Sequence, residues 1–231
     1  MTSGPAYFPK RFTRIDALTR PDHYYLEEGD HCYFLGEYTA RKGFSHSATN
    51  KLIINFKKPM DRRGRPEWRY KHQSIETAAT ALYDALAGTN LDAVSFVPVP
   101  PSKARPDPLY DDRVAETLRI FSELNRTKLN REVHICEAVV QSCSMEAAHD
   151  GSARPNPPEL VANYQIDAAH AKLLRTHAFI FDDVLTTGAT LAACAEALRA
   201  SGARRVYGLV LASAVYDKAA DAGGYGSPAE G

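Results

Sequence analysis

Two adjacent carboxylates, Asp182 and Asp183, follow an apolar run and precede a short turn of small and hydroxyl-bearing residues. The turn comprises Thr186, Thr187, Gly188, Ala189 and Thr190, and a helix is expected to begin there. The first N–H groups of a helix lack internal acceptors, and its dipole favours an anion. The carboxylates can accept hydrogen bonds from a vicinal diol, directly or through a hydrated metal ion. This pattern predicts a site for a ribose 5-phosphate.

A second group of polar residues follows another apolar run. The segment "FVPVPPSKARP", residues 96–106, ends in a turn bounded by prolines that carries Ser102, Lys103 and Arg105. Backbone N–H groups and these side chains suit a diphosphate, because arginine can bind oxyanions in bidentate fashion and lysine acts as a point charge. The alternative is an ordinary surface loop with basic residues.

Apolar runs and amphipathic segments alternate along most of the chain. Strands are predicted at residues 93–100, 133–140, 177–184 and 205–215, and helices at 74–88, 111–126 and 189–202, with one short helix near 167–174. Continuous apolar strands separated by helices predict a parallel sheet covered on both faces. Ligands of such sheets bind beyond the carboxyl ends of the strands, where both polar groups lie.

The N-terminal part has a different composition. Residues 32–40 and 51–59 are rich in aromatic and β-branched residues and predict a hairpin or two neighbouring strands. The expected organisation is an N-terminal arm (1–22), a strand-rich subdomain (23–72), an α/β core (73–217) and a flexible tail (218–231).

The composition gives the chain no net charge that would attract a nucleic acid or an anionic membrane over its whole surface. The 231 residues carry 28 basic and 28 acidic side chains, so any electrostatic specificity is local. The sequence lacks an apolar run of about 18 residues and a signal-peptide core, which predicts a cytoplasmic protein without a membrane partner. The four cysteines form no C-x-x-C pair, which favours free thiols in a reducing compartment.

One basic stretch stands out locally. Residues 51–71 contain eight basic residues against two acids, with Trp68 and Tyr70 interleaved. The stretch is interpreted as a solvated strand end and loop; the alternative is a surface for weak nucleic-acid contact with aromatic stacking platforms.

The segment "AFIFDDVLTTGAT", residues 178–190, resembles the phosphoribosyl-pyrophosphate (PRPP) signature of type I phosphoribosyltransferases. The resemblance implies their fold, a parallel Rossmann-like sheet flanked by helices, with an N-terminal strand-rich hood over the acceptor base. In that hood, Glu37, Tyr38, Ser45 and Asn50 are candidate base contacts. The resemblance also implies that PRPP binds with its 5-phosphate on residues 186–190 and its diphosphate near residues 101–105. The ribose diol would lie on Asp182 and Asp183, which would hold Mg²⁺ through water or the ligand.

Residues 141–176 lie where this family carries its catalytic loop. The segment resembles the Q-S…R…N pattern of the competence-protein-F-like (ComF-like) branch, with Gln141, Ser142, Arg154 and Asn163. Arg154 and His149 are candidate catalytic residues; solvated positions in a loop are the alternative. The cysteine-rich zinc module of that branch is missing. Thr186 stands where relatives acting on 6-oxopurines have an acid, so pyrimidine or ComF-like members are the better analogues.

The expected function is therefore a Mg²⁺-dependent phosphoribosyltransferase, a glycosyltransferase that moves the 5-phosphoribosyl group to a nitrogen acceptor and releases diphosphate. A homodimer is expected by analogy. Two alternatives stay open: a PRPP- or nucleotide-sensing regulator without turnover, which could touch nucleic acid, and a defence-type effector that modifies nucleotides.

Overall fold

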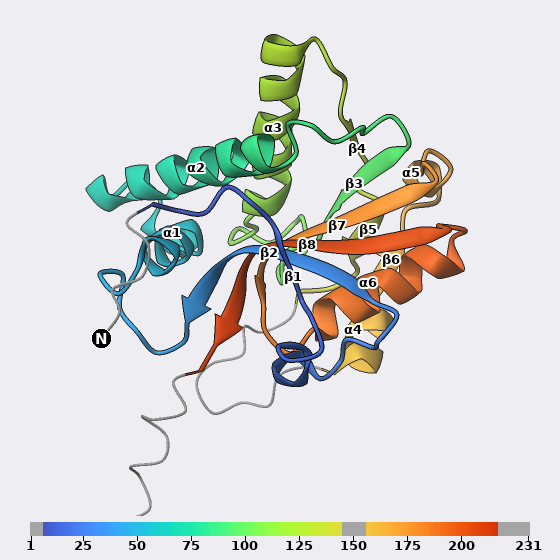
Figure 1. Cartoon of the computed structure of the whole chain (residues 1–231), viewed down its shortest axis with the longest axis horizontal. Helices are drawn as coiled ribbons and strands as arrows, with labels where there is room; N and C mark the ends of the chain where they lie inside the picture. The colour runs from blue at the N-terminus through green and yellow to red at the C-terminus, as the bar shows by residue number, and fades with distance from the viewer. Residues whose placement is uncertain (1–6, 145–155, 217–231) are drawn as a thin grey trace, which may run out of the picture.

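A six-stranded, mostly parallel sheet forms the centre of the computed structural model, which describes residues 7–144 and 156–216 (Figure 1). The strand order is β1-β2-β8-β7-β3-β4, and only the β1–β2 pair is antiparallel. The strands are β1 (Thr13–Arg14), β2 (His31–Thr39), β3 (Val94–Pro98), β4 (His134–Ile135), β7 (His177–Leu185) and β8 (Arg205–Val215). The protein is thus α/β, with a sheet compatible with a Rossmann-like arrangement.

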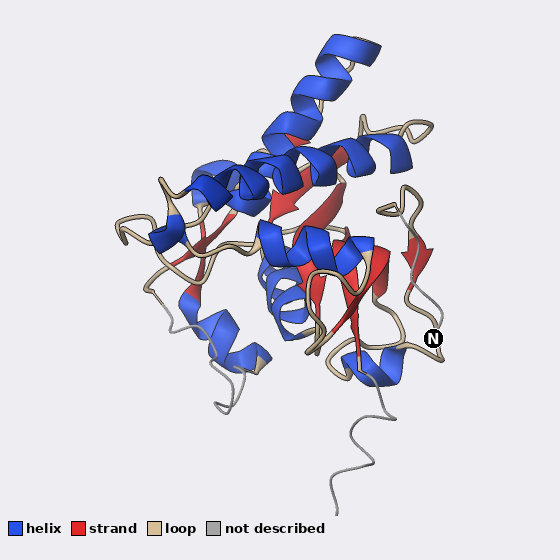
Figure 2. Ribbon diagram, turned by 90° about the vertical axis from the view of Figure 1, so that its left-hand side faces the viewer, coloured by secondary structure: helices blue, strands red, loops and turns tan. Residues whose placement is uncertain are grey.

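Helices cover both faces of this sheet (Figures 1 and 2). One face carries α1 (Ala48–Phe56), α2 (Arg69–Ala85) and α3 (Arg113–Leu129), and the other carries α6 (Ala189–Ala200) with α4 (Pro157–Asn163). The first face is filled by the buried aromatic rings of Phe56, Phe96, Phe121 and Phe181. Burial on both faces explains why β3, β7 and β8 are apolar without alternation.

The predicted core elements are confirmed, with shifted ends. The strands predicted at 93–100, 177–184 and 205–215 are β3, β7 and β8, and the three long predicted helices are α2, α3 and α6. The short helix predicted near 167–174 is α5 (Ala168–Ala171). Helix α2 begins five residues earlier than predicted, because the 3₁₀ turn Pro66–Trp68 continues into it with Trp68 already in the helical region.

The strand predicted at 51–59 is wrong, because these residues belong to helix α1. Ser47 caps this helix by accepting the Asn50 N–H at 3.0 Å. The apolar residues Leu52, Ile53 and Phe56 recur at helical spacing and are buried. The contacts of this apolar face therefore outweigh the β-propensity of the isoleucines.

The prediction of a strand-rich region over residues 23–72 is corrected accordingly. Its one long strand, β2, joins the main sheet in parallel with β8, and most of the rest is helix and turn. Asn50, a predicted contact for a base, is fully buried and exchanges hydrogen bonds with the Thr39 backbone at 3.1 and 2.9 Å. Asn50 therefore has a structural role here.

The strand predicted at 133–140 is divided into β4 and β5 (Val139–Gln141). The Cys136 N–H donates to the Phe96 carbonyl at 2.8 Å, which is the last bond of the β3–β4 ladder. The next bond of a parallel ladder requires an N–H on residue 98, and Pro98 has none, so the chain leaves the sheet. Strand β5 pairs instead, antiparallel, with β6 (Tyr164–Ile166).

Two parts of the prediction lie outside the described residues. His149 and Arg154 fall within residues 145–155, and the whole of the predicted flexible tail (218–231) falls within 217–231. The proposed boundaries of the arm, subdomain and core stay predictions.

Candidate functional site

The PRPP-like segment forms a strand, a turn and a helix at the carboxyl edge of the sheet. Strand β7 ends at Leu185, and α6 begins at Ala189 after Gly188, which adopts a left-handed backbone with φ 87°. Strand β3 pairs with β7 in parallel, with Pro98 opposite Phe181. The loop 99–106 therefore leaves the same edge as the turn 186–190, so the two predicted phosphate-binding segments are neighbours.

Residues 23–26 support the turn from the side of its carbonyl groups. The buried ring of His23 lies within hydrogen-bonding distance of the Thr186 carbonyl through Nδ1 and of the Ser213 hydroxyl, at 2.8 Å, through Nε2. The Tyr25 N–H donates to the Thr187 carbonyl at 3.0 Å. The N–H groups of Thr187 and Gly188, in contrast, donate to no acceptor among the residues that the structure describes. The turn thus keeps donors available for an anion.

Asp183 is buried and engaged with two cations. Its side chain lies on the face covered by α1, α2 and α3. Lys57 Nζ lies 3.1 Å from Asp183 Oδ1, and Arg113 donates to Oδ2 from Nε at 3.0 Å and Nη2 at 2.6 Å. Burial disfavours the charged carboxylate, but Lys57 and Arg113 outweigh it and hold the pKa of Asp183 below its ordinary value. The predicted diol contact of Asp183 requires one of these pairs to open.

The ion pairs of Asp183 continue into a larger buried network. Arg113 Nη1 donates to Asp111 Oδ2 at 2.7 Å, and Lys71 Nζ donates to the same oxygen at 2.8 Å. Lys71 also donates to the backbone carbonyl groups of Phe56 and Lys58, both at 2.9 Å. Burial lowers the pKa of Lys71 although Asp111 opposes this shift. The network joins the end of β7 to all three helices on this face.

Asp182 points to the opposite face of the sheet, as alternation along a strand requires. Its Oδ1 accepts the Asp183 N–H at 2.7 Å, and the side chain is half-buried. Burial and the charge of Asp183 raise the pKa of Asp182. The charge of Asp182 in turn contributes to the raised pKa values of Tyr164 and Cys194, in both of which burial is the largest cause. Of the two acids, Asp182 is the one without a salt bridge among the described residues.

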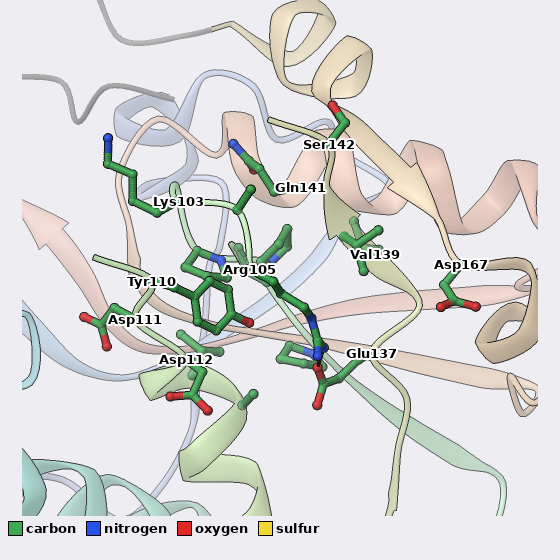
Figure 3. Close-up of a pocket in the computed structure, with 18 of the residues that line it drawn as sticks. Lys103, Arg105, Tyr110, Asp111, Asp112, Glu137, Val139, Gln141, Ser142 and Asp167 are labelled. Atoms are coloured by element: carbon green, nitrogen blue, oxygen red, sulfur yellow. Dashed lines mark hydrogen bonds and ion pairs between the residues drawn. The ribbon is translucent and has the colours of Figure 1, made fainter. Parts of the chain in front are cut away.

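The basic loop, residues 99–106, borders a cavity of about 480 Å³ (Figure 3). Its floor is apolar and includes Pro98, Val99, Val114 and Val139, and its rim carries Lys103, Arg105, Tyr110, Glu137 and Gln141. Arg105 is paired with Glu137, and in Figure 3 these two side chains meet at one side of the cavity while Lys103 extends away from them. Lys103 forms no ion pair with a described residue. Residues 182–190 do not line this cavity, so it adjoins the signature without including it.

The start of the predicted catalytic loop, residues 141–176, is held to Asn163 within the same segment. Ser142 Oγ donates to Asn163 Oδ1 at 2.6 Å, and the Cys143 N–H donates to the same oxygen at 3.2 Å. Gln141 Nε2 donates to the Ser102 carbonyl at 3.3 Å, which connects β5 to the basic loop. Gln141 of the Q-S…R…N pattern thus contacts the loop 101–105, and Ser142, the next residue in the chain, is hydrogen-bonded to Asn163 of the same pattern. Arg154 is outside the described residues.

The basic stretch 51–71 is not a continuous free surface. Lys71 is buried, so its interpretation as a solvated residue is wrong. Lys57 pairs with Asp183. Lys58 binds Asn55 Oδ1 at 2.7 Å and lies over the Tyr70 ring. The remaining basic residues, Lys51, Arg62, Arg63, Arg65 and Arg69, are exposed. Contact with nucleic acid stays a prediction.

The described residues include no group of three or more His, Cys, Asp or Glu side chains placed to hold a metal ion. Asp183 is committed to cations, which leaves Asp182 as the carboxylate able to face a hydrated ion. Mg²⁺ favours ligand phosphates and water with few protein carboxylates, so this single acid fits an ion that arrives with its ligand.

No family model matches the sequence, and a search of the curated proteins found no relative. The resemblance to phosphoribosyltransferases therefore depends on the motifs themselves. None of the helices in the described parts of the chain combines the length and apolar character needed to cross a membrane.

His23, Asp111 and Arg113 were not among the site residues predicted from the sequence. Asp111 stands at the start of a predicted helix, where acidic residues are common for reasons of capping and dipole. Arg113 has no comparable local explanation. No local signal relates either residue to Asp183, which is 70 residues from Arg113 along the chain. His23 carried no signal beyond its residue type.

Proposed function

We propose that this protein binds PRPP with Mg²⁺ and transfers its 5-phosphoribosyl group to a nitrogen acceptor, releasing diphosphate. The observation that carries the proposal is the placement of residues 178–190. They form a strand, a turn with available N–H donors and a helix, beside the basic loop that follows β3. A phosphate on this turn would meet the N–H groups of Thr187 and Gly188 and the dipole of α6.

The two acids have different roles in this proposal. Asp182, half-buried and without a cationic partner among the described residues, would accept hydrogen bonds from the ribose hydroxyl groups. It would also orient a hydrated Mg²⁺, which supplies charge neutralisation for the departing diphosphate when bound. Asp183 would act indirectly, because its ion pairs hold Lys57 and Arg113 at the end of β7. Its own contact with the diol would follow only from opening of these pairs.

The loop 101–105 would meet the diphosphate, with Lys103 available and Arg105 shared with Glu137. In the reaction the acceptor nitrogen donates its lone pair to C1′ of the ribose. Diphosphate departs with the electron pair of the C1′–O bond, and the acceptor proton passes to solvent. Most of the rate enhancement would come from positioning and electrostatic stabilisation.

Calorimetric titration with PRPP and Mg²⁺ tests the binding site. The variant Asp182→Asn keeps the shape but removes the charge, and we expect it to weaken binding by about tenfold or more, as for loss of a charge-assisted hydrogen bond. Asp92→Asn is the matched control, because Asp92 is exposed and precedes β3 at the opposite edge of the sheet. Wild-type protein that does not bind PRPP refutes the proposal.

Diphosphate release with PRPP and a panel of nucleobases tests the transfer step. Release that depends on a base supports the transferase. Tight PRPP binding without release for any base favours the alternative of a PRPP-sensing regulator.

A further inference from the structure

Lys57 differs from the other cations that surround Asp183. The side chain of Lys57 is 47% exposed, whereas those of Arg113 and Lys71 are 19% and 3% exposed. Arg113 donates to two carboxylates, and Lys71 donates to a carboxylate and two carbonyl groups. An ammonium group has three N–H donors, and Lys57 directs one of them at Asp183. Its remaining donors have no partner among the described residues.

The location of Lys57 is fixed from two directions. It follows the last residue of α1, and its backbone N–H donates to the Ile53 carbonyl at 2.9 Å. At the other end of the side chain, Asp183 holds the ammonium group at the carboxyl end of β7. A cation with free donors thus lies at the carboxyl edge of the sheet, where the PRPP-like segment and the basic loop are neighbours.

The charge balance of the network favours an anion at this edge. Three cations, Lys57, Lys71 and Arg113, surround two carboxylates, those of Asp111 and Asp183. Arg113 and Lys71 are deeply placed and satisfied, so the accessible N–H donors of this network are those of Lys57. A phosphoryl oxygen arriving there can form a charge-assisted hydrogen bond with an ammonium group that Asp183 already holds in place.

We propose that Lys57 binds the diphosphate group of the ligand and that Asp183 and Arg113 are its positioning residues. This inference rests on the proposed function. The turn 186–190, proposed for the 5-phosphate, leads into α6 on the opposite face of the sheet. Arg113, which shares Asp183 with Lys57, also donates to Asp111, and Asp111 lines the same cavity as Lys103 and Arg105 of the loop that would hold the diphosphate. Lys57 would therefore complete the diphosphate site from the side of α1.

Four proteins test the inference: wild type, Lys57→Gln, Lys57→Arg and Lys58→Gln. Lys58 is the matched control, because it is the next residue and its ammonium group is bound to Asn55. Each is titrated with magnesium diphosphate and, separately, with ribose 5-phosphate. We expect Lys57→Gln to weaken diphosphate binding by about tenfold or more. Its binding of ribose 5-phosphate, and both affinities of Lys58→Gln, should stay within about twofold of wild type.

Two further readouts separate ligand contact from a structural role. The diphosphate affinity of Lys57→Gln should depend less steeply on salt than that of wild type, because one ionic contact is lost. Lys57→Arg keeps the charge and should retain most of the affinity. Unchanged diphosphate binding by Lys57→Gln, or equal loss for both ligands, overturns the inference.

The failure of the proposed function has a different signature. Wild-type protein that binds neither ligand refutes the phosphoribosyl site as a whole. Wild-type protein that binds ribose 5-phosphate but not diphosphate refutes the role of Lys57 and leaves the sugar-phosphate site standing.

Discussion

Replacing Arg113 by methionine tests whether the buried ion-pair network supports the site. The substitution keeps an unbranched apolar stem beside Phe56, whose ring lies 5.8 Å from the guanidinium group. It removes the three hydrogen bonds to Asp183 and Asp111, at 3.0, 2.6 and 2.7 Å. Both carboxylates are left with one cation each, Lys57 for Asp183 and Lys71 for Asp111. The loss therefore reports the charge of Arg113 more than its packing.

The expected cost follows from the burial of the partners. Removing one member of a buried pair costs about 3–5 kcal/mol. Because each carboxylate keeps a second cation, we expect the lower end, about 3 kcal/mol. For a chain of this length, about 2–4 °C of Tm is lost per kcal/mol, so Tm should fall by about 6–12 °C. Arg119→Met is the control: Arg119 pairs with Asp112 at 2.7 Å, but its side chain is 51% exposed, and such pairs contribute about 0–1 kcal/mol.

Urea unfolding followed by circular dichroism measures the free energies, and its pH dependence identifies the cause. In wild type the pKa of Asp183 is held low by Lys57 and Arg113 against the effect of burial. This carboxylate therefore contributes stability above the ordinary pKa of aspartate, and the contribution is lost as the pH falls through the lowered pKa. Without Arg113 the Asp183 carboxylate contributes less stability. The difference in unfolding free energy between wild type and variant should therefore shrink below about pH 4. A cost under about 1 kcal/mol, or a difference that does not change with pH, would refute the reasoning.

Three further predictions concern the turn, the acid and the base of the loop. Gly188→Ala should destabilise the protein by about 1–3 kcal/mol in urea, because a Cβ would come within 2.9 Å of Leu26 Cγ at a φ of 87°; Gly202→Ala, at a φ of 95° but in open space, should cost less. The affinity for PRPP should rise between about pH 5 and pH 8 as Asp182, whose pKa is raised, ionises, and this rise should vanish in Asp182→Asn; a pH-independent affinity contradicts it. Asn163→Ala should cost about 0.5–1.5 kcal/mol in urea, the net contribution of a hydrogen bond, because it removes the acceptor shared by Ser142 and Cys143, two exposed residues that water can solvate; an unchanged midpoint would show that this clamp is dispensable.

Strong local patterns predicted most of the core. The apolar runs of β3, β7 and β8 are buried on both faces, so their sequences identify them without long-range information. The prediction for residues 51–59 was wrong because the isoleucines there favour a strand. The helical spacing is visible only when Leu52, Ile53 and Phe56 are assigned to one buried face. The break after β4 depends on Pro98 of the neighbouring strand, which no reading of residues 133–140 alone could reveal.

The order of two acids, a turn of small residues and a helix along residues 178–190 could be predicted from the sequence, because adjacency along the chain is a local property. The different surroundings of the two acids, Asp182 half-buried and Asp183 paired with Lys57 and Arg113, depend on segments far away in the chain. Lys57 reaches Asp183 across 126 residues of sequence. Such a pairing is selected by the packing of α1 and α3 on one face of the sheet, and the burial of the apolar faces of these helices offsets the cost of desolvating the charges.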